Sequence, residues 1–189
     1  MLLLGWWRIL LYKRLHIYRL LLLIDITRLS RVFMSESNPY LGRAQRFVGA
    51  LRQCQVLGMQ VIEADDEGLT IVLQYNEGHV GNPSTGVIHG GVLTTLMDTA
   101  SGTMVINALP EFELCPTLDL RVDYVRAAEP HKSIFAFAEA YRVSRNVVFT
   151  RCTVHQGNIE SPVANCVAAF MRIGAHMTPP DFKALVVGD

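Results

Sequence analysis

A single long apolar segment, residues 89–108, constrains the fold of this chain more than any other feature. It begins with His-Gly-Gly and stops before Pro110, as a helix bounded by a glycine-rich turn and a proline would. Apolar side chains point to most sides of such a helix: Val92, Leu93, Leu96, Met97, Ala100, Met104, Val105 and Ile106. A helix that is apolar on most faces is stable only when other elements cover it. The segment therefore predicts a long central helix wrapped by the rest of the chain.

Most of the remaining body has the composition of β-strands joined by short turns. Residues 58–65 and 69–75 predict a hairpin, and four longer strand-like runs follow the central helix at 115–127, 132–144, 147–156 and 162–173. Because the connections at 145–146 and 157–161 are short, we expect neighbouring runs to pair as an antiparallel meander. With a first helix predicted over 39–53, the expected class is α+β. It is a curved antiparallel sheet of about six strands wrapped around one long central helix.

The net charge of the chain is zero, but the charges are unevenly distributed. The 189 residues include 17 Lys and Arg and 17 Asp and Glu. Nucleic-acid binding needs a basic surplus, so this composition argues against it. Residues 1–33 carry six basic residues and one acidic residue, which leaves the rest of the chain acidic overall. We therefore divide the chain into a basic leucine-rich extension at 1–33, a globular domain at 34–175 and a C-terminal tail at 176–189.

The N-terminal extension is open to three interpretations. Charges interrupt its apolar runs, the longest being 1–7 and 20–24, so it lacks the ~20 apolar residues of a stable membrane span. It suits a basic amphipathic helix on a membrane surface, or an organelle transit segment rich in Arg and poor in acids. The third interpretation is that Met34 is the true start and that the upstream residues do not belong to the native protein.

The cysteines are widely spaced and form no Cys-x-x-Cys motif; they are Cys54, Cys115, Cys152 and Cys166. Zinc sites and disulfide frameworks use clustered cysteines, so neither is expected, and no metal site is predicted. Reduced thiols indicate a cytoplasmic protein. Membrane-surface or organelle targeting by residues 1–33 stays open beside that prediction.

The start of the central helix has the properties of an anion or carbonyl site. A helix N-terminus presents unpaired backbone N–H groups and the positive end of the helix dipole. Gly90 and Gly91 leave those N–H groups unshielded, so a ligand carbonyl bound there would lie in an oxyanion hole. The alternative explanation for the two glycines is tight packing of the helix start against a strand.

Asp98 is a lone carboxylate on this apolar helix. It follows Gly90 by eight residues, which places it about 12 Å further along the axis at about 1.5 Å per residue. Within one chain, Asp98 cannot reach a carbonyl held at the Gly90 N–H. Either neighbouring hydroxyls satisfy Asp98 as a structural residue, or two antiparallel helices meet across a two-fold axis and bring Asp98 of one chain to Gly90 of the other.

The segment "NPSTGVIHGGVLTTLMDTASG", residues 82–102, resembles the central-helix motif of hotdog-fold acyl-CoA thioesterases of the PaaI type, in the 4-hydroxybenzoyl-CoA thioesterase-like superfamily. The shared motif is His-Gly-Gly with an acid eight residues after the first Gly. The resemblance covers about residues 39–173, including the order of helices and strands. It implies a hotdog thioesterase domain at 34–175 that hydrolyses acyl-CoA thioesters to free acid and CoA.

The resemblance also implies catalytic roles for four residues. Gly90 N–H would polarise the thioester carbonyl, and Asn82 would help to hold the carbonyl or a water. Asp98 of the partner chain would act as general base or as nucleophile. Thr117 occupies the place of a Ser or Thr that orients the carboxylate or the water. A positioned carboxylate, a water and an oxyanion hole suffice for thioester hydrolysis, so no cofactor is expected.

We assign substrate binding to residues at the start of the central helix and to basic side chains on the surface. The resemblance implies that His89 would shape the turn, and Gly91 leaves the helix start open. The CoA phosphates call for basic residues near the mouth of the site, and we select Arg145 from the arginines that flank the strand ends, Arg126, Arg142, Arg145 and Arg151.

The sequence therefore predicts an acyl-CoA thioesterase that self-associates as a homodimer or a dimer of dimers, with no nucleic-acid partner. Two alternatives stay open. One is a hotdog-fold dehydratase acting on hydroxyacyl thioesters, and the other is a non-catalytic module that binds or senses acyl-CoA.

Overall fold

The computed structural model describes residues 38–188 of the chain. The interpretations of residues 1–33 lie outside these described residues, and the domain boundaries at 34–175 and 176–189 stay predictions. Within the described range, no helix combines the length and apolar character that crossing a bilayer requires.

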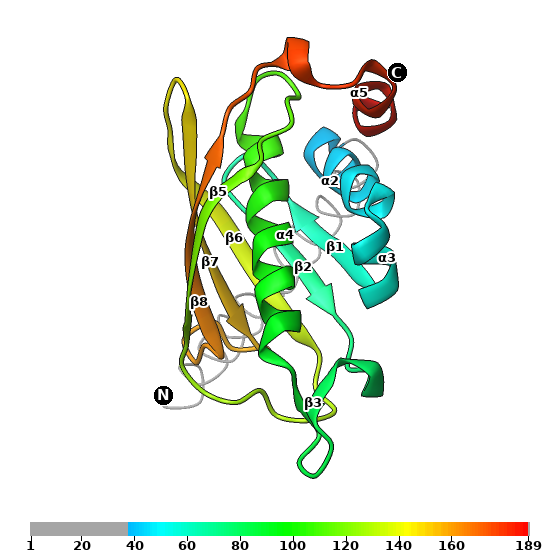
Figure 1. The fold of residues 1–189 in the computed structure, drawn as a ribbon, viewed down its shortest axis with the longest axis vertical. Helices are drawn as coiled ribbons and strands as arrows, with labels where there is room; N and C mark the ends of the chain where they lie inside the picture. The colour runs from blue at the N-terminus through cyan, green and yellow to red at the C-terminus, as the bar shows by residue number, and fades with distance from the viewer. Residues whose placement is uncertain (1–37, 189) are drawn as a thin grey trace, which may run out of the picture. The chain divides into compact units, whose positions relative to one another are not determined.

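The core of the described chain is a six-stranded antiparallel sheet that curves around one long helix, α4 (Gly90–Ala108) (Figure 1). The strands are β1 (Met59–Ala64), β2 (Leu69–Leu73), β5 (Thr117–Tyr124), β6 (Ile134–Val143), β7 (Val147–His155) and β8 (Ala164–Met171). Burial alternates along β6, β7 and β8, so every second side chain faces α4. The predicted α+β class and the sheet wrapped around a central helix are confirmed.

The strand order differs from the simple meander expected from the short turns. The order is β1-β2-β6-β7-β8-β5, so β5 pairs with β8 and not with β6, the next strand in the chain. Tight connections join β6 to β7 and β7 to β8, and these strands pair as expected. The connection from β5 to β6, residues 125–133, is long enough to cross the end of the sheet, which frees β6 to pair with β2. The meander prediction was wrong at this one step.

Helix α4 is buried on most of its surface but is not wrapped completely. Leu96, Met97, Ala100 and Met104 are fully buried against the sheet and the N-terminal helix. A stripe of smaller residues at helical spacing stays partly or fully exposed: Gly91, Thr95, Asp98 and Gly102. One face of the central helix is therefore open to solvent in the single chain.

The predicted first helix is divided in two, α2 (Pro39–Ala50) and α3 (Arg52–Leu57), with extended backbone at Leu51. Gly58 ends α3 in the left-handed conformation, φ 71°, which favours glycine at this position. The turn-rich segment before α4 contains a 3-10 turn (Glu77–His79) and a small hairpin, β3 (Val80–Asn82) and β4 (Val87–Ile88). After β8, a 3-10 turn (Ala175–Met177) leads to α5 (Pro180–Val187), which packs on α2.

Candidate active site

The start of α4 leaves one backbone N–H free. His89 is the N-cap residue, and its Nδ1 accepts a hydrogen bond from Gly91 N–H at 2.9 Å. The Gly91 N–H thus already donates to an acceptor within the chain. Gly90 N–H, at the first helical position, has no hydrogen-bond acceptor among residues 38–188. Of the two glycines, Gly90 is therefore the one that can donate to a bound carbonyl.

Three residues that the sequence analysis did not single out hold this helix start. Tyr124 Oη donates to the Gly90 carbonyl oxygen at 2.8 Å, and Thr94 Oγ1 lies 2.6 Å from the same phenol oxygen. Gly81 packs so closely that a Cβ there would lie 2.8 Å from His89 Cα. Tyr124 is 34 residues from Gly90, so no local pattern could have indicated this contact. Gly81 could have been noticed in the sequence, because it is a glycine in the loop before the His-Gly-Gly motif.

Asn82 lies at the end of β3, beside the turn that leads to α4. Its Oδ1 accepts from Ser84 N–H at 3.0 Å, and its backbone oxygen accepts from Gly86 N–H at 2.9 Å. Because a backbone N–H only donates, the accepting side-chain atom must be the oxygen. The Asn82 side chain is exposed, and its Nδ2 group is thus available to donate a hydrogen bond to a ligand.

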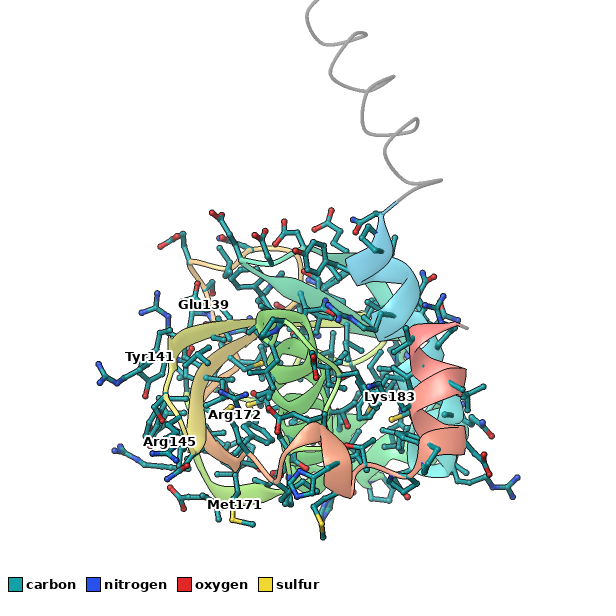
Figure 2. All side chains as sticks on the ribbon, turned by 90° about the horizontal axis from the view of Figure 1, so that it is seen from above. Glu139, Tyr141, Arg145, Met171, Arg172 and Lys183 are labelled. Carbon is teal, nitrogen blue, oxygen red and sulfur yellow. The ribbon has the colours of Figure 1, made fainter. Side chains whose placement is uncertain are left out.

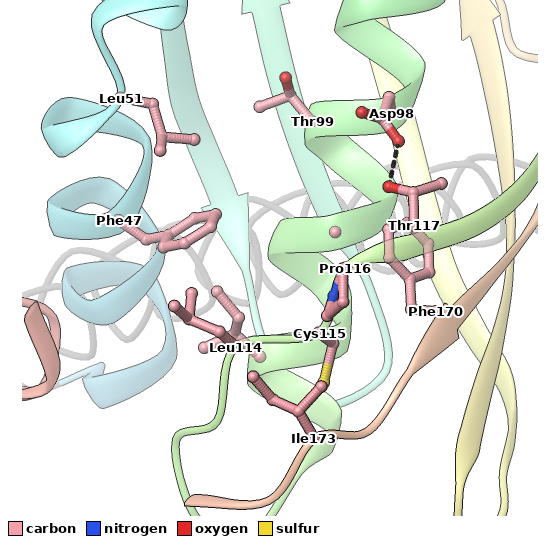
Figure 3. A pocket seen from close by; sticks show the side chains of 12 residues that line it. Phe47, Leu51, Asp98, Thr99, Leu114, Cys115, Pro116, Thr117, Phe170 and Ile173 are labelled. Carbon is pink, nitrogen blue, oxygen red and sulfur yellow. Dashed lines mark hydrogen bonds between the residues drawn. The ribbon is translucent and has the colours of Figure 1, made fainter. Parts of the chain in front are cut away.

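Asp98 and Thr117 meet on the open side of α4. Thr117, the first residue of β5, donates from Oγ1 to Asp98 Oδ1 at 2.9 Å (Figure 3). A hydrogen bond to a charged acceptor is stronger than a neutral one and fixes the orientation of the carboxylate. Asp98 is half-buried.

The pair lies beside a pocket of about 410 Å³. Asp98, Thr117 and Phe170 are on one side of this pocket, and Phe47 of α2 and Leu51, between α2 and α3, lie across it (Figure 3). The other lining residues are mainly apolar: Thr99, Gly102, Ile106, Leu114, Cys115, Pro116 and Ile173. An apolar pocket with a few polar groups at one side is typical of a small-ligand site.

One chain does not bring all the predicted catalytic residues together. Gly90 lies in a separate hollow of about 260 Å³ that is also lined by Leu93, Tyr124 and Arg126. It is eight residues from Asp98 along α4, or about 12 Å. The donors at the helix start and the carboxylate in the larger pocket therefore lie in two separate hollows of the single chain.

The arginines considered for the CoA phosphates lie in different places. Arg145 projects from the outer turn between β6 and β7 (Figure 2), at the end of the sheet opposite the start of α4 in the same chain (Figure 1). Arg126 lies beside Gly90, and its guanidinium donates to the backbone oxygens of Ala127 and Ser161. Arg151 pairs with Glu139, and Arg142 is exposed on β6.

Cys115 is the thiol nearest to the carboxylate pocket. Burial raises its pKa to about 11, with a further contribution from the neighbouring charge of Glu113. A thiol with that pKa is protonated near neutral pH and is a poor nucleophile. Across residues 38–188, no three His, Cys, Asp or Glu side chains gather as a metal site would require.

Comparisons with known proteins agree with the fold. A family model described as "Thioesterase superfamily" matches residues 85–163, from the turn before α4 to the residue before β8. A solved structure of a Pseudomonas aeruginosa protein is 54% identical, with a TM-score of 0.66, over 71% of this chain and 99% of that protein.

Two curated relatives match over shorter regions. A Halobacterium salinarum protein named as a candidate esterase is 36% identical over 94 residues, which are 48% of this chain and 61% of the relative. The chain thus matches less than two thirds of that relative. The protein YigI of Escherichia coli, named a medium/long-chain acyl-CoA thioesterase, is 25% identical over 130 residues, 62% of this chain and 83% of the relative.

The resemblance to thioesterases drawn from the sequence is confirmed, and these similarities support thioester hydrolysis as the general activity. The match covers α4, where Gly90 and Asp98 lie, and β6 and β7, which pack against it. The family model matches the central helix and the strands that pack on it, and the chain covers 99% of a solved relative at 54% identity; the chain belongs to the thioesterase superfamily.

Proposed function

We propose that this chain hydrolyses acyl-CoA thioesters at two equivalent sites of a homodimer. Each site would combine Gly90 and Asn82 of one protomer with Asp98 and Thr117 of the partner subunit. The observation that carries the proposal is the separation of two half-sites along one helix. A free amide lies at the start of α4, and a hydroxyl-held carboxylate lies about 12 Å away beside an apolar pocket.

Two features of the single chain support the dimer. The open stripe on α4 consists mostly of small residues, which lets a second helix approach closely. Within residues 38–188, β5 is an edge strand that pairs with β8 alone, and it exposes Leu118 and Tyr124. Long exposed apolar edges are templates for pairing with another chain. A two-fold axis across α4 would run the two helices antiparallel and repeat the composite site twice.

The proposed reaction consumes one water. Asp98 of the partner subunit, as general base, accepts a proton while the water oxygen attacks the thioester carbonyl carbon. Negative charge develops on the carbonyl oxygen, where Gly90 N–H and Asn82 Nδ2 donate hydrogen bonds. The C–S bond then breaks, and the CoA sulfur leaves with the proton held by the carboxyl group. As nucleophile, the same carboxylate would first form an anhydride with the acyl group, which water then hydrolyses.

Coenzyme A as the leaving group is supported by similarity and by charge. The relative YigI is named an acyl-CoA thioesterase. In this chain Arg126 lies beside Gly90, where a phosphate-bearing leaving group would pass. A guanidinium that uses some of its N–H groups on backbone oxygens keeps others for phosphate.

The direct test is thiol release from a series of acyl-CoAs by the wild type and by Asp98→Asn. We expect the wild type to turn over at least one acyl class and Asp98→Asn to lose about 10²- to 10⁴-fold in kcat, as for the loss of a general base. Asp66→Asn, an exposed carboxylate in the β1–β2 turn, is the matched control and should retain wild-type activity. Tight acyl-CoA binding without turnover in any class would instead identify a binding module, and loss of water from hydroxyacyl-CoA would identify a dehydratase.

A mixing experiment tests the shared site. Asp98→Ala and Gly90→Pro each inactivate both sites of their own homodimer. In a mixed dimer, one site keeps an intact Gly90 and an intact Asp98 if the two residues act across the interface. Random exchange at equal concentrations should restore about a quarter of wild-type activity, because half of the dimers are mixed and each has one working site. Mixed dimers without activity would refute catalysis across the interface.

A further inference from the structure

The carboxylate pocket has a measurable depth along α4. Asp98, Gly102 and Ile106 all line it, one helical turn apart. From Asp98 to Ile106 is eight residues, or about 12 Å. An extended chain advances about 1.2 Å per bond, since a residue of three backbone bonds spans at most about 3.6 Å. A straight acyl chain of about ten carbons would therefore reach from the carboxylate to the far end.

Phe47 packs against the buried cluster that contains Ile106, at that far end, and its ring is held in place by two other aromatic rings. It lies across the pocket from Asp98 (Figure 3). Its ring centroid is 6.5 Å from that of Phe112 and 6.0 Å from that of Phe182, both edge-to-face, and the Phe112 and Phe182 centroids are 6.1 Å apart. Phe182 belongs to α5, so the C-terminal helix supports the wall of the pocket from behind.

Helix α5 is fastened to the body at several points. Arg46, one residue before Phe47, donates from Nε to the Val186 oxygen at 2.8 Å and from Nη2 to the Val187 oxygen at 2.6 Å. Val186 is fully buried, in the same cluster as Ile106 and Phe112. The arginine thus satisfies carbonyl oxygens at the C-terminal end of α5, which have no partner within the helix.

The segment that leads into α5 is tied to the loop that forms the floor of the pocket. Leu114 N–H donates to Thr178 Oγ1 at 3.1 Å, and Gly174 N–H donates to the buried Glu113 carboxylate at 2.6 Å. Leu114 itself lines the pocket. A displacement of the C-terminal segment would therefore shift both Leu114 at the floor of the pocket and the Phe47 ring at its wall.

We propose that α5 determines acyl-chain selectivity by holding Phe47 as the end wall of the pocket. Phe182 is then a positioning residue, and the site accepts straight aliphatic acyl groups up to about ten carbons. This inference rests on the proposed function for the identity of the acyl thioester. Residues 180–187 lie outside the region matched by the family model, so this selectivity belongs to the chain and not to the shared motif.

The test compares kcat/KM for acyl-CoAs of six to sixteen carbons in wild type, Phe182→Ala and Phe182→Leu. Each methylene that gains a buried place should improve kcat/KM about fourfold, from ~0.8 kcal/mol per CH₂. We expect Phe182→Ala to raise the ratio of fourteen-carbon to ten-carbon kcat/KM by roughly tenfold or more. Phe182→Leu should give a smaller shift in the same direction. Leu185→Ala is the matched control on the same helix, because that side chain is 54% exposed, and its profile should equal that of wild type.

Leu51→Phe tests the opposite direction, since Leu51 lines the same side of the pocket as Phe47 and a larger ring there takes space from the acyl chain. The larger side chain should shift the preferred length to shorter chains. Parallel loss of activity at every length in Phe182→Ala, or an unchanged profile in both Phe182 variants and Leu51→Phe, would overturn the proposal. A merely structural role of α5 would lower all rates together and leave the ratios constant.

An equilibrium measurement separates this proposal from the catalytic one. Binding of straight-chain alcohols of six to sixteen carbons, followed by calorimetry, needs no turnover. In wild type the affinity should rise about fourfold per methylene and level off near ten carbons, whereas in Phe182→Ala it should level off at a longer chain. If the alcohols show this pattern while no acyl-CoA is hydrolysed, the proposed function fails and the role of α5 stands. If the plateau is the same in both proteins, the role of α5 is refuted.

Discussion

Replacing Gly90 by proline removes one backbone N–H with little other change. Proline is favoured at the first position of a helix, where its missing N–H has no intrahelical partner. The residue before a proline prefers extended backbone, and His89 already has φ −63° and ψ 133°. His89 Nδ1 still accepts from Gly91 N–H in the variant, so the helix cap is retained. The substitution therefore acts on the amide at the start of α4 that has no acceptor among residues 38–188.

The expected loss follows from that single donor. Removing one donor from an oxyanion hole costs about 2.7–4 kcal/mol in the transition state, or about 10²- to 10³-fold in kcat. Stability should change little, because no hydrogen bond within residues 38–188 uses the Gly90 N–H. The affinity for substrate should also be largely kept, since the donor interacts most strongly with the charge that develops in the transition state.

Gly90→Ala is the matched control, because it keeps the N–H and adds the same first side-chain carbon. That Cβ would lie 3.2 Å from Tyr124 Oη, a tight contact that both variants share. We would measure kcat and KM for a good acyl-CoA substrate in both variants, with urea unfolding to confirm equal stability. Equal kcat for Gly90→Pro and Gly90→Ala would refute the assignment of the Gly90 amide as the oxyanion donor.

Three further predictions follow from other contacts. Thr117→Val removes the hydroxyl that orients the Asp98 carboxylate and should lower kcat about 10- to 100-fold, the equivalent of about 1.5–3 kcal/mol. Thr153→Val, a similar change on β7 away from the site, should leave kcat unchanged, and equal kcat in the two variants would contradict the orienting role of Thr117. With a pKa of about 11, the Cys115 thiol should react slowly with iodoacetamide at pH 8, and the rate should rise about tenfold for each pH unit above pH 8, as followed by mass spectrometry. Rapid labelling at pH 8 would show that the thiol is not shielded. Glu113→Gln leaves the Arg172 guanidinium without its buried carboxylate partner and should lower the free energy of unfolding by about 3 kcal/mol in urea titrations; a loss below about 1 kcal/mol would mean that the pair contributes little.

Features with a local signal were predictable from the sequence alone. The bounds of α4 follow from an apolar run between His-Gly-Gly and Pro110, and the structure begins the helix at Gly90 and ends it at Ala108. The strands follow from apolar runs separated by turn residues, and each predicted run contains a strand. The separation of Gly90 and Asp98 follows from helix geometry, because the rise per residue is constant.

Contacts between distant segments had no such signal. The sequence did not indicate that β5 would pair with β8, because strands of similar composition offer several partners and only packing selects among them. The Tyr124 hydroxyl on the Gly90 carbonyl joins residues 34 apart, and the Phe47 ring meets Phe182 from the far end of the chain.

The sequence by itself determined that the central helix begins at a glycine amide and carries a lone carboxylate about 12 Å further along, because the rise per residue of a helix is constant. The tertiary structure decided everything that depends on neighbouring surfaces. It selected which glycine amide stays free, which hydroxyl holds Asp98 and which side chains close the pocket. The physical reason is that helix geometry acts over a few residues, whereas side-chain packing depends on the shapes that the whole chain brings together.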